Sequence, residues 1–176
     1  MADTTFNTDS GRTIDREMLV AYLNTGTAAS PVWSAIGTRV ADSSESLDWS
    51  KNTEQDILGN TFTTLKKPVV TQSFDPIKLD AGDPAYVKLW NLGIKNQDAQ
   101  ELAAQDVLIV HLYAGSSSTP FAERYPSSAI EVTSIGGEGG GVVEIAAEIT
   151  YGGKRDTGTA TKDDATGVVT FTSAAA

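Results

Sequence analysis

The segment of residues 107–113 constrains the fold of this chain most strongly. It is apolar throughout, interrupted only by His111, and it is rich in β-branched side chains. A strand without a polar face is typical of a sheet that is covered on both sides. We therefore expect residues 107–113 to form a central strand with packing against each of its faces.

Most of the other apolar segments also have strand character. Valine, threonine and phenylalanine are frequent in them, and apolar and polar residues alternate with a period of two. Pro68 separates two of these segments, and six residues that include five glycines separate the last two. Residues 142–151 also fit a helical spacing, but their β-branched content and glycine boundary favour a strand. The expected strands cover residues 20–23, 32–40, 44–49, 61–65, 69–74, 129–135 and 142–151.

One amphipathic helix is well indicated. Asp83 is a good N-cap, Pro84 suits the first helical position, and Gly93 is placed to end the helix. Residues 97–105 could add a further helical turn. We expect an apolar stripe of the main helix to pack on the sheet, and its members are Tyr86, Val87, Leu89 and Trp90.

A length of 176 residues suits one domain with flexible ends. Residues 1–16 offer almost nothing to bury and are interpreted as a mobile N-terminal arm. Residues 17–151 then form the β domain, and residues 152–176 form a C-terminal strand and arm. The expected fold is mainly β (α+β), a sandwich or small barrel with one flanking helix, long loops and terminal arms.

Composition excludes several classes of function. The net charge is −10 and no cluster of lysine and arginine is present, so tight binding to nucleic acid is not expected. Cysteine is absent, which removes disulfides and thiolate chemistry. No apolar run reaches the roughly 20 residues of a membrane-spanning helix, and the first 16 residues do not resemble a secretory signal. We expect a protein that is made and kept in a cytoplasm, or in something assembled there.

Candidate catalytic groups are few. His111 is the single histidine and lies in the most apolar segment, which favours a structural role. Glu144 and Glu148 could face one way as a carboxylate pair for glycoside hydrolysis, but no aromatic cleft accompanies them, so a solvated face is favoured. The run of residues 136–141 lacks the lysine and hydroxyl of a phosphate-binding loop and is interpreted as a hairpin turn.

Metal-binding patterns are not found either. Asp163 and Asp164 lack the alternating oxygen ligands of a calcium loop. The acidic residues between positions 42 and 56 are diffuse and do not have a ligand spacing. The sequence therefore predicts no catalytic residue, no cofactor and no metal, and we expect a protein that is not an enzyme.

Several stretches, in this order, resemble the major tail proteins of siphophages, which build the tail tube. The resemblance extends over roughly residues 18–161 and depends on order and texture, because the family has no short diagnostic motif. The stretches are residues 18–22 (MLVAY), 33–38 (WSAIGT), 46–50 (SLDWS), 57–60 (ILGN), 74–77 (FDPI), 83–86 (DPAY) and 125–130 (YPSSAI).

The resemblance implies a β-sandwich with a flanking helix, assembled as homohexameric rings that stack into a tube. It implies the tape measure protein as a partner inside the tube, with tail terminator and distal tail proteins at its ends. DNA would pass transiently, without tight binding, and no membrane partner is implied. The location would be the virion tail, after assembly in the host cytoplasm.

If the resemblance holds, residues 44–73 correspond to the hairpin and loop that build the lumen and the contacts between rings. We hypothesise that four acidic residues of this region line the lumen or the ring contacts: Glu45, Asp48, Glu54 and Asp56. A negative lumen would let DNA slide without adhering. The structural alternative is that these residues are ordinary solvated acids.

Three other functions remain open. The first is another virion structural protein, such as a capsid decoration protein or a head–tail adaptor, which self-assembly would distinguish from a tube subunit. The second is a carbohydrate-binding β-sandwich, but Trp33, Trp49 and Trp90 fall in three separate elements. A hydrolase is the third and lacks a plausible base.

Overall fold

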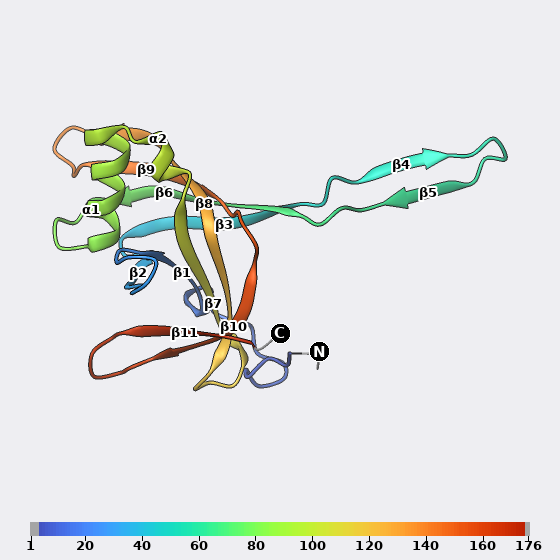
Figure 1. Cartoon of the computed structure of the whole chain (residues 1–176), viewed down its shortest axis with the longest axis horizontal. Coiled ribbons are helices and arrows are strands. Elements are labelled where there is room, and N and C mark those ends of the chain that lie inside the picture. Colours follow the sequence, from blue (N-terminus) through green and yellow to red (C-terminus); the bar gives the residue numbers. More distant parts are fainter. Residues whose placement is uncertain (1–3, 175–176) are drawn as a thin grey trace.

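The computed structural model describes residues 4–174 and is mainly β (Figure 1). The helical elements are short: η1 (Arg16–Met18), α1 (Pro84–Trp90), η2 (Asn91–Asn96), which is π-helical, and α2 (Ala99–Leu102). The strands are β1 (Leu19–Asn24), β2 (Trp33–Ile36), β3 (Val40–Asp48), β4 (Asn52–Gln55), β5 (Thr61–Thr64), β6 (Val69–Lys78), β7 (Gln105–Gly115), β8 (Pro120–Gly136), β9 (Glu144–Thr150), β10 (Asp156–Lys162) and β11 (Val169–Ser173).

Strand β8 joins the two halves of the main sheet. Its first part pairs with β7 and β10, and its second part pairs with β9. The strand order is β2-β1-β7-β8-β9-β6-β3, with β10 and β11 attached through β8. Because β8 belongs to both halves, the sheet curls into a half-barrel. The strands at the two ends of the sheet run in different directions in Figure 1.

The expected central strand is confirmed as β7, which is covered on both faces. Val107 and Ile109 lie in a core cluster between the two halves of the curled sheet, together with residues of α1 and β9. Leu108 and Val110 point the other way, into a second cluster beneath the β10–β11 hairpin. Alternate residues of one strand thus serve two cores, which explains why the segment has no polar face.

The helix begins where the sequence predicts. The Asp83 side chain accepts hydrogen bonds from the backbone N–H groups of Ala85 (2.9 Å) and Tyr86 (3.4 Å), and Pro84 is the first helical residue. The prediction that Gly93 ends the helix is wrong. The helical segment continues through η2 to Asn96, and its C-cap is Gln97, whose backbone is left-handed with φ 50°.

The expected apolar stripe divides into a buried part and an exposed part. Tyr86 and Leu89 are buried, whereas Val87 and Trp90 are 42% and 36% exposed, so the expectation for these two is corrected. Successive helical residues are separated by about 100°. Ala85, Leu89 and Tyr86 therefore share one arc toward the core, and Val87 lies well beyond it.

Other boundaries also differ from the sequence-based expectation. Residues 32–40 are not one strand: β2 ends at Ile36, the chain turns through Arg39 at φ 60°, and β3 begins at Val40. The expected strand of residues 129–135 is the second part of a much longer β8. In the C-terminal segment, β10 pairs with β8, so residues 156–173 are built into the sheet. In the N-terminal arm, Phe6 makes a bridge to Ala114.

Candidate interaction surface

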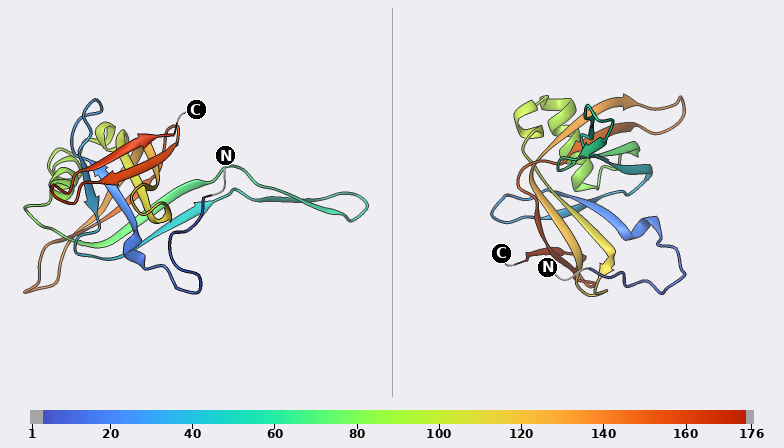
Figure 2. Two further views of the ribbon diagram at one scale, coloured as in Figure 1. Left: turned by 90° about the horizontal axis from the view of Figure 1, so that it is seen from below. Right: turned by 90° about the vertical axis from the view of Figure 1, so that its right-hand side faces the viewer.

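A long hairpin projects from the body of the molecule (Figures 1 and 2). Strands β3 and β6 pair antiparallel from Val40↔Ile77 to Asp48↔Val69, and β4 and β5 continue outward as a separate two-stranded ladder. The two parts meet at a joint where Ser50 has φ 44° and the N–H of Lys66 donates to the carbonyl of Trp49 at 2.9 Å. The predicted break at Pro68 is confirmed, because β6 begins at Val69.

The outer part of this hairpin, residues 47–69, has no covering layer in the described chain. All residues of β4 and β5 are exposed. The large apolar side chains along it remain 46–102% exposed, and they are Leu47, Trp49, Ile57, Leu58, Phe62, Leu65 and Val69. An isolated two-stranded hairpin is only marginally stable in water. The outer part of this hairpin is therefore a candidate interaction surface.

The tip of the hairpin is a rigid turn with an apolar crest. The Asp56 carboxylate accepts hydrogen bonds from the N–H groups of Leu58 (2.9 Å) and Asn60 (2.8 Å) and from the Asn60 side chain (2.9 Å). These bonds lower the pKa of Asp56. With the backbone held in this way, Ile57 and Leu58 point outward, 102% and 81% exposed.

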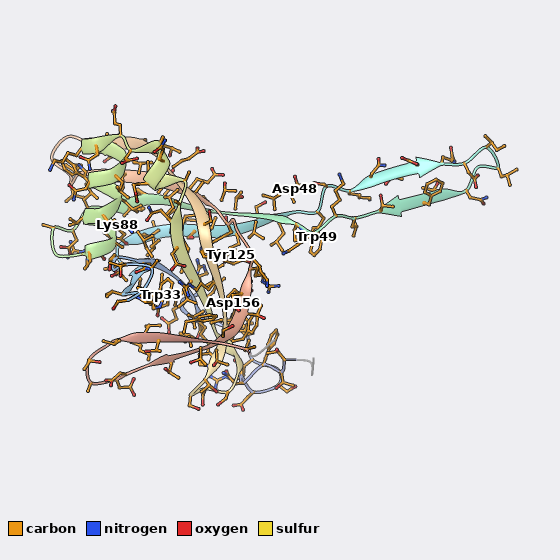
Figure 3. All side chains as sticks on the ribbon, in the orientation of Figure 1. Trp33, Asp48, Trp49, Lys88, Tyr125 and Asp156 are labelled. Atoms are coloured by element: carbon orange, nitrogen blue, oxygen red, sulfur yellow. The ribbon has the colours of Figure 1, made fainter. Side chains whose placement is uncertain are left out.

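A groove of about 760 Å³ lies where the hairpin leaves the body. Figure 3 shows Asp48 and Trp49 at this point. The hairpin contributes apolar side chains to one wall, and Ile109, Tyr125 and Tyr151 of the body form another. The cationic side chains at the groove are Lys66, Lys67 and Arg155. Among the described residues, neither lysine forms an ion pair.

A polar cluster closes the inner end of this groove. Glu123 accepts hydrogen bonds from Arg155 Nε (2.5 Å) and Tyr125 (2.8 Å), and its other oxygen lies 3.0 Å from His111 Nε2. His111 Nδ1 is 2.9 Å from the Tyr113 hydroxyl. Burial by itself raises the pKa of Glu123, but these hydrogen bonds outweigh it and hold the pKa at about 2. His111 thus has two side-chain partners, Tyr113 and Glu123.

The four acidic residues predicted as one functional group are not on one surface. Glu45 pairs with the buried Gln72 in the β3–β6 ladder and points into the groove, where burial raises its pKa and its Oε1 has no hydrogen-bond partner in the described chain. Asp48 and Glu54 are exposed, and Asp56 is half-buried. Asp48 accepts a hydrogen bond from the N–H of Ser50, and Glu54 accepts one from the Asn52 side chain.

The alternation that places Glu45 inside places a different set of acids outside. On the outer face of β3, β6, β9 and β8, one cross-strand row runs from Ser44 through Ser73 and Glu148 to Glu131. The neighbouring row pairs Asp42 with Asp75, and Lys78 pairs with Glu144 at the end of the face. This outer acidic face is lined by Asp42, Asp48, Asp75, Glu131, Glu144 and Glu148, with serine and threonine between them. Of the two carboxylates expected on a solvated face, Glu148 is exposed and Glu144 is half-buried.

A second apolar surface lies beside α1. Its cavity of about 550 Å³ is lined by Leu79, Asp80, Ala81, Tyr86, Val87, Trp90, Val142 and Val143. The exposed residues of the split helical stripe belong to this surface. Its only charged lining residue is Asp80, whose carboxylate lies 3.1 Å from Arg39.

The other motifs from the sequence have local structural roles. Residues 137–143 connect β8 to β9, with Gly137 and Gly140 at positive φ. Asp163 accepts hydrogen bonds from the N–H groups of Ala165 and Thr166 and shapes the turn between β10 and β11. Residues 4–174 contain no group of three or more potential metal ligands. Within the same residues, no helix is long and apolar enough to cross a membrane.

No protein-family model matches this chain, and no curated protein matches its sequence. Among solved structures, it is similar to a chain of the sheath/tube terminator of an extracellular contractile injection system in its extended state. The TM-score is 0.52 at 10% identity, over 85% of this chain and 99% of that chain. It is also similar to a chain of the tube-terminating cap of the anti-feeding prophage, with a TM-score of 0.51 at 9% identity, over 87% and 95% of the two chains.

At such low identity, the likeness shows a shared fold and nothing further. It confirms the predicted fold class, a mainly β fold of the tail-tube type with one flanking amphipathic helix.

Proposed function

We propose that this chain is a structural subunit of a phage-type tail tube. Copies of the chain associate as hexameric rings, and the rings stack around a tape measure protein. Tail terminator and distal tail proteins bind at the two ends of the tube. The assembled tube then conducts the genome during ejection, and the subunit itself is not an enzyme. Its location is the virion tail, after assembly in the host cytoplasm.

The projecting hairpin is the observation that carries this proposal. A monomer that exposes both faces of a two-stranded ladder, with Ile57 and Leu58 uncovered at its tip, has surface left for a partner. Edge strand β3 pairs only with β6, so its outer edge is also open to pairing. Copies of the same chain are the simplest partner, because most oligomers are homo-oligomers with closed symmetry.

The outer acidic face supports the role of a conduit. Glu131 and Glu148 are direct cross-strand partners, and like charges in this position are destabilising. Such an arrangement costs stability in the monomer, and it suits a surface that repels phosphate groups. We assign this face to the lumen in place of the acids of the hairpin tip, which lie far from it along the hairpin (Figure 1).

Electron microscopy of the purified protein over a concentration series tests this proposal. Hollow tubes, or stacked rings with sixfold end views, are the expected result. A chain that stays monomeric at millimolar concentration would overturn the proposal. Binding only to capsid shells or to a portal-proximal ring would favour a capsid decoration protein or a head–tail adaptor.

The second candidate is a subunit of a ring that ends a tube. The two solved structures described above are of tube-ending assemblies, a sheath/tube terminator and a tube-terminating cap. The same micrographs distinguish the two roles. Single rings that do not stack at any concentration favour the terminator, and tubes of varying length favour the tube subunit.

A further inference from the structure

The geometry points to the partner surface of the hairpin: the tip of one copy, residues 56–60, docks in the groove at the hairpin base of a second copy. This inference rests on the proposed self-assembly and specifies one contact within it. The tip and the groove are separate surfaces of one chain, so the contact is head-to-tail. Head-to-tail contacts of this kind generate rings where the rotation closes, and filaments where it does not.

The tip has the properties of a pre-organised ligand. Asp56 holds the turn through three hydrogen bonds from Leu58 and Asn60, and Gln55 Nε2 donates to the carbonyl of Gly59 at 3.0 Å. A turn fixed before binding loses little conformational entropy when it docks. The crest of Ile57 and Leu58 supplies the apolar contact, with the acids Glu54 and Asp56 beside it.

The groove is complementary to the tip in size and in charge. Its volume of about 760 Å³ lies in the range of pockets that hold drug-sized ligands, roughly 300–1,000 Å³, so it has room for a two-residue crest. Its apolar walls include Leu47, Trp49 and Val69. Lys66 and Lys67 stand at the groove without an ion-pair partner in the described chain and would face the acids of the tip.

An unsatisfied atom inside the groove also fits an incoming segment. Glu45 Oε1 is buried and has no hydrogen-bond partner in residues 4–174. A buried acceptor without a partner costs free energy, and a donor from a docked chain would remove that cost. The Asn60 side-chain amide of the tip is a donor of the required kind, because its bond to Asp56 uses only one of its two N–H hydrogens.

The tip cannot reach the groove of its own chain. The hairpin carries residues 56–60 away from the body, and the groove lies at the opposite end of the hairpin (Figures 1 and 2). The apolar surface beside α1 is the rival acceptor on the second copy. Its only charged lining residue is Asp80, which is paired with Arg39, so this surface offers no cation to Glu54 and Asp56. The two lysines of the groove make it the better match.

Disulfide cross-linking tests the contact directly, because the natural chain contains no cysteine. Leu58→Cys combined with Val69→Cys is expected to give a ladder of covalent multimers when assembled protein is mildly oxidised. Leu58→Cys alone is expected to give dimers at most. The matched control combines Leu58→Cys with Val143→Cys, which places the second cysteine on the surface beside α1.

The outcomes separate the inference from the proposed function. Tubes or rings without a ladder in the Val69 variant, or with an equal ladder in the Val143 variant, would overturn the inference and leave self-assembly standing. If the natural chain forms no assembly at all, both fail.

A charge-swap series provides the second test. Lys66→Glu with Lys67→Glu is expected to raise the concentration for half-assembly by about tenfold or more, because like charges then meet at the contact. Adding Glu54→Lys in the same chain is expected to restore much of the loss. Lys162→Glu, an exposed change at the end of β10, serves as the control. Unchanged assembly in the double lysine variant would contradict the proposed contact.

Discussion

Gly93 of η2 lies directly against Val132 of β8: a Cβ atom on Gly93 would be 2.6 Å from Val132 Cγ2 and 2.9 Å from Val132 Cβ. The helical segment therefore packs on the sheet at a distance that only glycine permits at this position. The residue that the sequence marks as a helix end is in fact a point of close contact between the helical segment and the sheet.

Gly93→Ala is expected to lower the free energy of unfolding by about 1–3 kcal/mol, because the added methyl group forces the two layers apart. Denaturant unfolding measures the change. Gly139→Ala is the control, since a Cβ there meets no atom within 4 Å. Combining Gly93→Ala with Val132→Ala should recover part of the loss. Equal effects of the Gly93 and Gly139 substitutions would contradict this account of the packing.

Glu123→Gln is expected to remove one pH-dependent part of the stability. The pKa of Glu123 in the folded protein, about 2, is below its ordinary value, so the contribution is present at neutral pH and is lost as pH falls from about 5 toward 2. We expect it to be on the order of 2 kcal/mol, after allowing for partial solvent screening. Denaturant unfolding between pH 2 and pH 7 measures it. Parallel pH curves for the natural chain and the variant would show that the cluster does not hold Glu123 ionised.

Tyr86→Phe is expected to cost about 1–2 kcal/mol, because it leaves two backbone groups without their partner. The Tyr86 hydroxyl donates to the carbonyl of Thr38 at 2.5 Å and accepts from the N–H of Gly37 at 3.3 Å. Burial, with smaller effects from Asp83 and Asp80, raises the pKa of Tyr86 to about 12. Since this pKa is raised, the contribution is present below pH 10 and is lost as pH approaches 12. The stability difference between the natural chain and the variant should therefore shrink at alkaline pH, and a constant difference would contradict it.

Glu131→Lys is expected to stabilise the monomer by about 0.2–1 kcal/mol, because it replaces a like-charge cross-strand pair with Glu148 by an opposite-charge pair. The gain should decrease at high salt. Glu131→Gln, which only removes the repulsion, should give a smaller gain. In assembled tubes the lysine variant should also retain DNA that the natural tube releases. A loss of stability in both variants would argue against direct repulsion between the two carboxylates.

The amino-acid sequence determined the features that depend on neighbours along the chain. The start of α1 follows from Asp83 and Pro84, because an N-cap acts within one turn. The central strand β7 follows from an apolar run without a polar face. The break before β6 follows from Pro68, which cannot donate a ladder hydrogen bond. The mainly β class follows from the same local patterns.

Tertiary structure decided the features that depend on pairing between distant segments. Strand β10 carries few apolar residues and is a strand because its backbone pairs with β8 and β11. The cluster of His111, Glu123 and Arg155 comes from β7, β8 and the residue just before β10, which are brought together because β8 pairs with both β7 and β10. Glu45 and its neighbour Ser44 differ by one position in a ladder whose register is set by β6, and that register sends one into the groove and the other to the outer acidic face. Period-two alternation indicates that two faces exist, but only the packed sheet determines which of them is inside.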